Sequence, residues 1–261
     1  MSRLPHLPAL AAATSFALLA ACSGPEQGSA AAPPPAATES AAAPGDVAEA
    51  QDIALFGTIS LRPDTYETFV AVLGENVRSS RQEPGNVSFE VFRPEDGSPT
   101  LLLFERWKDQ AAIDTHMQQP NLKAVIEAVR STGADASETH ELVEVQPSGA
   151  ASRRAPADPA TSRNVLVVLK VKPEAEETFL QAWRDVFPHA RAAPGNAVFE
   201  IYRDTKTPQT YVLIERWDSA EQHEAHLAQP YSLALDEVLP DTLAAPIVNG
   251  QNRFLAHGVL D

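Results

Sequence analysis

The feature that most constrains this chain is an internal repeat. The tripeptide Pro84-Gly85-Asn86 recurs as Pro194-Gly195-Asn196, at an offset of 110 residues. The same offset needs no gap from Pro63 to Glu127 in the first copy. It also relates three further pairs of motifs: Phe89-Glu90 with Phe199-Glu200, Glu105-Arg106-Trp107 with Glu215-Arg216-Trp217, and His116 with His226. A match this long at a fixed period predicts a duplicated domain.

The repeat sets the predicted domain boundaries. The first copy occupies residues 51–146 and the second occupies residues 164–261. Residues 147–163 are rich in Pro, Ser and Ala without an apolar period, which is typical of a linker. Residues 22–50 contain almost no large apolar side chains, so we expect a disordered tether there.

The first 21 residues read as an export signal. Arg3 precedes an apolar run, Leu7–Ala21, which is shorter than the about 20 residues that span a membrane. The sequence Leu19-Ala20-Ala21-Cys22 resembles the lipobox of bacterial lipoproteins, which implies lipidation of Cys22. Because Ser23 rather than an aspartate follows, the resemblance implies a cell-envelope location at the periplasmic face of the outer membrane. The alternative is an ordinary secretory signal with a chance cysteine, and the mass of the mature amino terminus distinguishes the two.

Composition excludes several function classes. The chain has 35 acidic and 20 basic side chains, a formal net charge of −15. Nucleic acids and anionic membrane surfaces require clustered Lys and Arg, so neither is an expected partner. A single cysteine excludes an internal disulfide and thiolate metal sites.

Each copy is predicted to contain four strands and intervening helices. Proline-bounded apolar runs and the strands that follow the Pro-Gly-Asn turns predict the strands, and apolar residues at helical spacing predict the helices. Pro188 should kink or end the first helix of copy two. The predicted strands are Ile53–Leu61, Val87–Arg93, Thr100–Trp107 and His140–Val145, and then Val165–Val171, Ala197–Arg203, Thr210–Trp217 and Arg253–Val259.

The strands appear apolar on both faces. In Leu101–Trp107 one face carries Leu101, Leu103 and Trp107, while the other carries Leu102 and Phe104. An antiparallel sheet covered on one side only would alternate apolar and polar residues. We therefore expect helices on one face and the sheet of the other copy on the opposite face, which makes the chain an intrachain pseudo-dimer.

The motifs of each copy match a known family pattern. The pattern comprises Arg-x-x-Pro-Gly at Arg81–Gly85 and Arg191–Gly195, then Phe-Glu-x-[Phe/Tyr]-Arg, then Glu-Arg-Trp, then a histidine nine residues after the tryptophan. Each copy resembles the antibiotic biosynthesis monooxygenase domain, a unit of the dimeric α/β barrel superfamily. The resemblance implies an α+β fold of two tandem ferredoxin-like βαββαβ domains, packed sheet to sheet as an intrachain pseudo-dimeric α/β barrel.

The resemblance also implies a chemistry. Members of the family include small monooxygenases that oxidise phenols or quinols to quinones with O₂ and need no metal, flavin or haem. The expected partner is therefore a small aromatic substrate, with no cofactor. Two rival hypotheses remain open: a non-catalytic small-molecule-binding envelope protein, and a purely structural pseudo-dimer with filled pockets.

His116 and His226 are the candidate general bases, because a neutral imidazole suits proton abstraction from a phenol. The alternative role for each is structural, for example a bridge to Glu105 or Glu215. A metal at His223 and His226, spaced i and i+3, is a weaker alternative, because Ile113 replaces His223 in copy one and no third ligand is evident.

The candidate substrate-binding residues come from the strands. Trp107 and Trp217 are expected to stack on a flat ring or to belong to the core. Glu105 and Glu215 share their face and require partners, for which Arg93, Arg203 and the histidines are available. Further candidates are Phe92 and Tyr202, on a face that is predicted to line the barrel interior.

Overall fold

The computed structural model describes residues 52–137, 139–145, 153–258 and 260. The predicted signal, Cys22 and the tether lie outside the described residues. Within the described part, no helix has the length and apolar character needed to cross a membrane.

The two copies have the predicted order of elements. Every predicted strand is observed, with ends within two residues of the prediction. Copy one contains β1 (Ile53–Ser60), α1 (Tyr66–Ser80), β2 (Asn86–Pro94), β3 (Thr100–Trp107), α2 (Gln110–His116), α3 (Pro120–Thr132), β4 (Asp135–Ala136) and β5 (His140–Glu144). Copy two contains β6 (Arg163–Lys170), η2 (Pro173–Ala175), α4 (Glu176–Ala192), β7 (Asn196–Asp204), β8 (Thr210–Trp217), α5 (Ala220–Leu227), α6 (Pro230–Thr242) and β9 (Arg253–Gly258).

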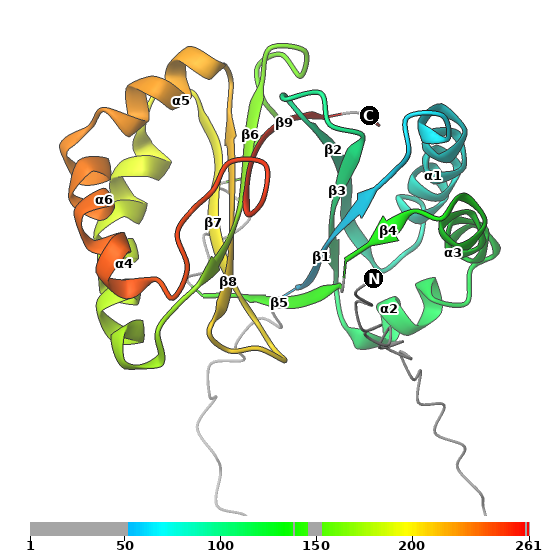
Figure 1. The fold of residues 1–261 in the computed structure, drawn as a ribbon, viewed down its shortest axis with the longest axis horizontal. Helices are drawn as coiled ribbons and strands as arrows, with labels where there is room; N and C mark the ends of the chain where they lie inside the picture. Colours follow the sequence, from blue (N-terminus) through cyan, green and yellow to red (C-terminus); the bar gives the residue numbers. More distant parts are fainter. Residues whose placement is uncertain (1–51, 138, 146–152, 259, 261) are drawn as a thin grey trace, which may run out of the picture. The chain divides into compact units, whose positions relative to one another are not determined.

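Eight of these strands close into a barrel by exchanging the last strand of each copy. The strands are joined in the order β3-β2-β9-β6-β8-β7-β5-β1, and β1 also pairs with β3. Strand β5 of copy one pairs with β7 of copy two, and β9 of copy two pairs with β2 of copy one. The helices lie outside, over the strands of their own copy (Figure 1). The predicted pseudo-dimeric α/β barrel is confirmed.

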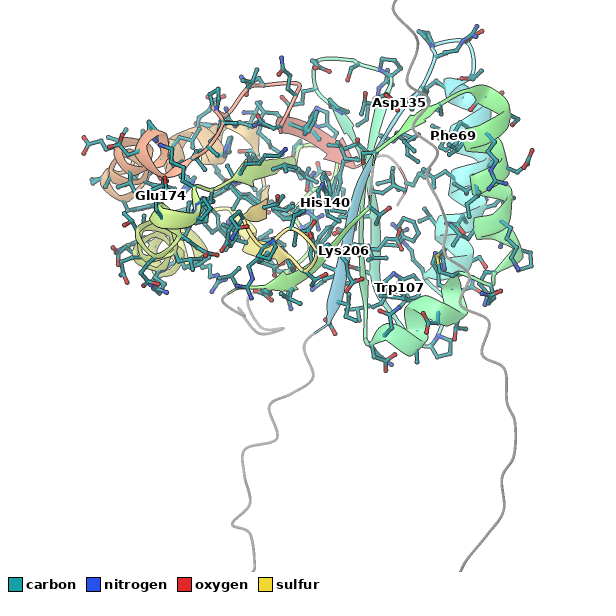
Figure 2. The ribbon with its side chains drawn as sticks, turned by 60° about the horizontal axis from the view of Figure 1, so that its bottom comes forward. Phe69, Trp107, Asp135, His140, Glu174 and Lys206 are labelled. Atoms are coloured by element: carbon teal, nitrogen blue, oxygen red, sulfur yellow. The ribbon has the colours of Figure 1, made fainter. Side chains whose placement is uncertain are left out.

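Side chains on the two faces of each strand enter different cores. One cluster fills the barrel and includes Phe56, Leu102, Leu142 and Val212. Separate clusters lie between each copy's strands and its helices, and Phe69 of α1 belongs to the one in copy one (Figure 2). Both faces of the sheet are therefore buried, which explains the absence of apolar–polar alternation.

The Pro-Gly-Asn turns position the helices that carry the histidines. A Cβ atom at Gly195, whose φ is 80°, would lie 2.2 Å from the side chain of Gln222 in α5. A Cβ atom at Gly85 would lie equally close to Ala112 in α2, 2.2 Å away. Glycine therefore allows each turn to touch the first turn of the helix. The side chains of Asp109 and Ser219 cap the same helices.

We predicted that Pro188 would kink or end its helix, and the structure shows that it does not end it. Helix α4 continues to Ala192. Proline removes only one donor at this point, near the end of the helix. Phe187 and Ala190 pack into the core of copy two, and Arg191 donates from Nε to the carbonyl of Phe199 at 3.0 Å. These contacts hold the last turn in place.

Candidate functional site

Each copy assembles the predicted glutamate, tryptophan and histidine beneath its helices. In copy one the rings of Trp107 and His116 stack with centroids 4.5 Å apart (Figure 2 labels Trp107). Trp107 donates from Nε1 to Glu105 at 2.9 Å. Copy two repeats this arrangement with Trp217 and His226, 4.5 Å apart, and with a 2.8 Å hydrogen bond from Trp217 to Glu215.

The partner of each glutamate is thus the tryptophan two residues later on its own strand. The predicted arginine partners are wrong for copy one, because the Arg93 guanidinium lies over the ring of Tyr66 at 4.8 Å. A histidine does lie near each carboxylate: His116 Nε2 is 3.9 Å from Glu105, and His223 Nε2 is 3.9 Å from Glu215.

Copy two encloses a cavity of about 300 Å³ beside this cluster. Its polar lining residues are Glu215, His226, Ser232, Asp236 and Arg253. The other lining residues are mainly apolar: Val165, Val167, Leu169, Trp183, Phe199, Leu213, Leu227, Leu235, Leu239 and Ile247. A dry protein cavity of about 150 Å³ is known to hold benzene, so the cavity has room for a one- or two-ring molecule.

The matching cavity of copy one is much smaller, about 110 Å³. Leu55, Gly57, Ile59, Leu103 and Glu105 line it, at the positions of Val165, Val167, Leu169, Leu213 and Glu215. His116 is not among its lining residues. The volume is below that of a cavity that holds benzene. The two copies therefore share the cluster. Of these two matching cavities, which described residues line, the one in copy two can hold a ring and the one in copy one cannot.

The two histidines also differ in their hydrogen bonds. His116 Nδ1 lies 2.9 Å from Glu83 Oε1, and copy two has Ala193 at the position of Glu83. His226 Nδ1 instead lies 3.0 Å from the hydroxyl of Tyr231. Among the described residues His226 Nε2 has no hydrogen bond, which leaves this nitrogen available to a ligand.

Burial sets the protonation states of the glutamate and the two histidines of the copy-two cluster. Burial raises the pKa of Glu215 to about 7, and the hydrogen bond from Trp217 opposes this only in part. Burial lowers the pKa of His226 to about 4. Burial, assisted by the positive charge of Arg253, lowers the pKa of His223 to about 3. At neutral pH both imidazoles are therefore neutral, and Glu215 exchanges a proton readily.

Trp183 is a wall residue that the motif analysis did not assign to the site. The residue is 2% exposed, and its Nε1 atom is buried without a hydrogen-bond partner among the residues that the structure describes. Copy one has Leu73 at this position. The motif analysis also did not assign Tyr231 and Ser232 to the site. Asn121 and Leu122 occupy the equivalent positions in copy one. The signal that identifies all three residues is divergence between otherwise matching copies.

Phe92 and Tyr202 do not belong to this site. They lie on the opposite face of their strands, inside the barrel. Tyr202 donates to Glu200 at 2.5 Å, and Phe92 lines a different cavity at the seam between the copies. The alternation of side chains along a strand predicted correctly that they face the barrel interior. The same alternation places Trp107 and Trp217 on the other face of the sheet, beneath the helices. Within the described part of the chain, no three His, Cys, Asp or Glu side chains form a metal-binding group.

A closed barrel of two ferredoxin-like units, with a buried Glu-Trp-His cluster under each helical layer, places the protein in the class of dimeric α/β barrels. The model of the family described as antibiotic biosynthesis monooxygenase matches residues 53–128 and 163–237. The chain belongs to this family and contains two copies of its domain.

Individual relatives match parts of the chain. A Synechocystis protein described as uncharacterized is 36% identical over 83 residues, which cover 31% of this chain and 56% of that protein. A Pestalotiopsis microspora protein described as a "putative monooxygenase" is 36% identical over 89 residues, covering 32% of this chain and 74% of that protein. The solved structure of a "putative monooxygenase" from Fusobacterium nucleatum has the same fold, with a TM-score of 0.65 at 14% identity, over 80% of this chain and 93% of that one. Family membership and the Pestalotiopsis relative support a monooxygenase-like function.

The raised pKa of Glu215 predicts a pH-dependent stability. A carboxyl whose folded pKa is about 7, against 4.5 for the free group, stabilises the fold below pH 4.5 and loses that contribution as pH rises through 7. Glu215→Gln removes this titration and keeps an acceptor for Trp217. Between pH 5 and pH 8 the variant should gain on the order of 3 kcal/mol in unfolding free energy relative to the unsubstituted protein. Urea unfolding at both pH values measures the difference, and a difference that does not change with pH contradicts the prediction.

Proposed function

We propose that copy two is a cofactor-independent monooxygenase site for a small phenol or quinol, with His226 as the proton acceptor. The observation that carries this proposal is the cavity of about 300 Å³, which combines an apolar wall with a neutral imidazole and a buried carboxyl. Copy one has the same cluster without the space, so the proposal concerns copy two alone.

The cavity chemistry suits an electron-rich aromatic ring. Apolar and aromatic side chains make up most of its lining, and a smaller number of polar side chains, among them Glu215 and His226, complete it. This division holds a flat ring by burial and orients its oxygen by a few hydrogen bonds. A charged substrate would lack a compensating partner at most of the surface.

The proposed reaction uses the substrate's own electrons. His226 Nε2 takes the phenol proton, and the phenolate passes one electron to O₂, giving a phenoxyl radical and superoxide. The two combine at a ring carbon to form a C–O bond. The O–O bond then breaks as the proton on that carbon is lost, which leaves a second carbonyl; the departing oxygen takes up this proton and the one held by His226, and leaves as water. One phenol and one O₂ thus become one quinone and one water.

The protein's part is to bind, orient and deprotonate. With a pKa of about 4, His226 is neutral at pH 7 and its ring is held against Trp217. Formation of a phenolate beside it favours the imidazolium and raises its proton affinity in the complex. Trp183 lines the cavity, and its buried N–H group has no acceptor among the described residues, so we assign it as a candidate donor to a ligand oxygen.

Copy one fits the structural alternative. Its cavity of about 110 Å³ is too small for an aromatic ring, and Glu83 takes up His116 Nδ1. We infer that copy one supplies the second half of the barrel rather than a second catalytic site.

The internal repeat provides a matched control for the proposed base. His226→Gln should lower kcat/KM for hydroquinone oxidation about 10²- to 10⁴-fold, the usual contribution of a positioned acid–base group. His116→Gln, the same change in copy one, should leave kcat/KM within about twofold. Enzyme-dependent O₂ uptake with a panel of phenols and hydroquinones measures both.

Three outcomes count against the proposal. Absence of enzyme-dependent O₂ uptake across the panel, with ligand binding retained, favours the non-catalytic binding hypothesis. Equal losses in the two variants place the chemistry elsewhere. A loss in His116→Gln alone assigns it to copy one.

A second variant tests the unpartnered indole. Trp183→Phe keeps an aromatic wall but removes the N–H donor. If this donor binds a substrate oxygen, KM should rise about three- to tenfold, as expected for loss of a hydrogen bond worth about 0.5–1.5 kcal/mol. Steady-state O₂ uptake measures KM, and an unchanged KM shows that the ring is only part of the wall.

A further inference from the structure

A groove adjoins the cavity of copy two. Its volume is about 440 Å³, and it shares Asp236, Leu239 and Ile247 with the wall of the cavity. Its other lining residues are Pro240, Leu243, Ala244, Ala245 and Pro246. Asp236 is thus the one ionisable residue that lines it. The two hollows are neighbours, and the groove is the less polar of the two.

The groove is formed by the segment between α6 and β9. Ten residues, 243–252, separate these two elements. The segment is held in place at both ends. Ala244 donates from its backbone nitrogen to the carbonyl of Lys170 at 2.7 Å. Asn252 accepts from the backbone of Val248 at 2.6 Å and donates to the carbonyl of Pro246 at 3.0 Å. The groove is therefore preformed.

Copy one has no such segment. Seven residues, 133–139, separate α3 from β5. They include β4, whose residues Asp135 and Ala136 pair with β1 (Figure 2 labels Asp135). Thr58 and Ser137 exchange two further hydrogen bonds, each 2.8 Å long. The shorter connection thus lies along the strand and narrows the cavity of copy one. The longer one in copy two leaves the strand after Leu243 and lines the groove.

We propose that the groove binds an apolar alkyl or prenyl chain attached to the ring that occupies the cavity of copy two. The substrate class is then a hydroquinone or phenol with an aliphatic substituent. This inference rests on the proposed function for the position of the ring. The adjacency of the two hollows carries it, because Asp236, Leu239 and Ile247 line both of them.

The groove walls match such a chain and do not match a polar substituent. Apart from Asp236, which the groove shares with the cavity, its lining side chains are proline, alanine, leucine and isoleucine. These offer no hydrogen bonds, so a polar substituent beside them would lose water without compensation. Ile247 is 38% exposed, and a bound chain would cover part of this apolar surface. A fully buried CH₂ group contributes about 0.8 kcal/mol, which is about fourfold in affinity. Because the groove is partly open, we expect about two- to threefold per methylene.

The test uses a series of 2-alkyl hydroquinones from unsubstituted to hexyl. Anaerobic titration by tryptophan fluorescence gives Kd without turnover, and O₂ uptake gives kcat/KM. From ethyl to hexyl, Kd should fall about 16- to 80-fold, since four methylenes contribute two- to threefold each. kcat/KM should rise in parallel.

A pair of alanine substitutions locates the effect. Ala244→Asp places a carboxylate in the groove, and Ala234→Asp makes the same change on the exposed surface of α6, away from both hollows. The ratio of Kd for the ethyl and hexyl compounds should fall to within about threefold of unity in Ala244→Asp and stay unchanged in Ala234→Asp.

The outcomes separate this inference from the proposed function. Oxidation with no dependence on chain length retains the function and overturns the groove. Binding that tightens with chain length and is lost in Ala244→Asp, but without O₂ uptake, retains the groove and overturns the function. Equal effects of the two aspartates also overturn the groove, because a general change of charge then accounts for them.

Discussion

The exchange of the last strands, β5 and β9, is the constraint on which the rest of the structure depends. Each of these strands pairs with a strand of the other copy. A single copy would therefore expose an unpaired strand edge and an apolar inner face, both of which favour aggregation. Leu142 of β5 and Ala256 of β9 are fully buried in the shared interior. Neither copy is expected to be stable alone. Both must therefore keep the fold, whether or not each has a catalytic function.

That dependence explains how the two copies came to differ. In a symmetric dimer of identical chains, any change in a pocket appears twice. Within one chain, the cavity of copy two can widen while copy one keeps a tightly packed helical layer. Glu83 beside His116 and the β4 strand paired with β1 belong to copy one only. Both reduce the space around its cluster without disturbing the barrel.

The sequence predicts the barrel well because the responsible pattern is periodic. The 110-residue offset and the two apolar faces of Leu101–Trp107 require a sheet covered on both sides, and the duplication supplies the cover. The pairing of Glu215 with Trp217 could not be predicted, because it depends on side-chain rotamers within one strand. The cavity volumes could not be predicted either. They depend on the path of the connection between the last helix and the last strand of each copy, which is only three residues longer in copy two. The spacing of residues in the sequence does not predict that path. The helix continues past Pro188 for a related reason, since the packing of Phe187 and Ala190 into the core outweighs the tendency of proline to end a helix.

The copy-two site also shows why an unpartnered polar group is informative. A buried donor without an acceptor costs about 1–3 kcal/mol, and Trp183 Nε1 is such a donor in the cavity wall. A leucine, which copy one has at this position, would avoid that cost. Glu215, in the same lining, is held at a pKa of about 7 by burial. Behind it, His223 Nε2 lies 3.9 Å from the carboxylate, and neither ring nitrogen of His223 has a hydrogen bond within the described part of the chain. Trp183 and Glu215 thus both line the cavity that has room for a ring. A ligand oxygen that accepts a hydrogen bond from the Trp183 indole would recover part of the free energy that this unpaired donor costs. The destabilising groups therefore favour copy two as the half of the barrel that binds a ligand.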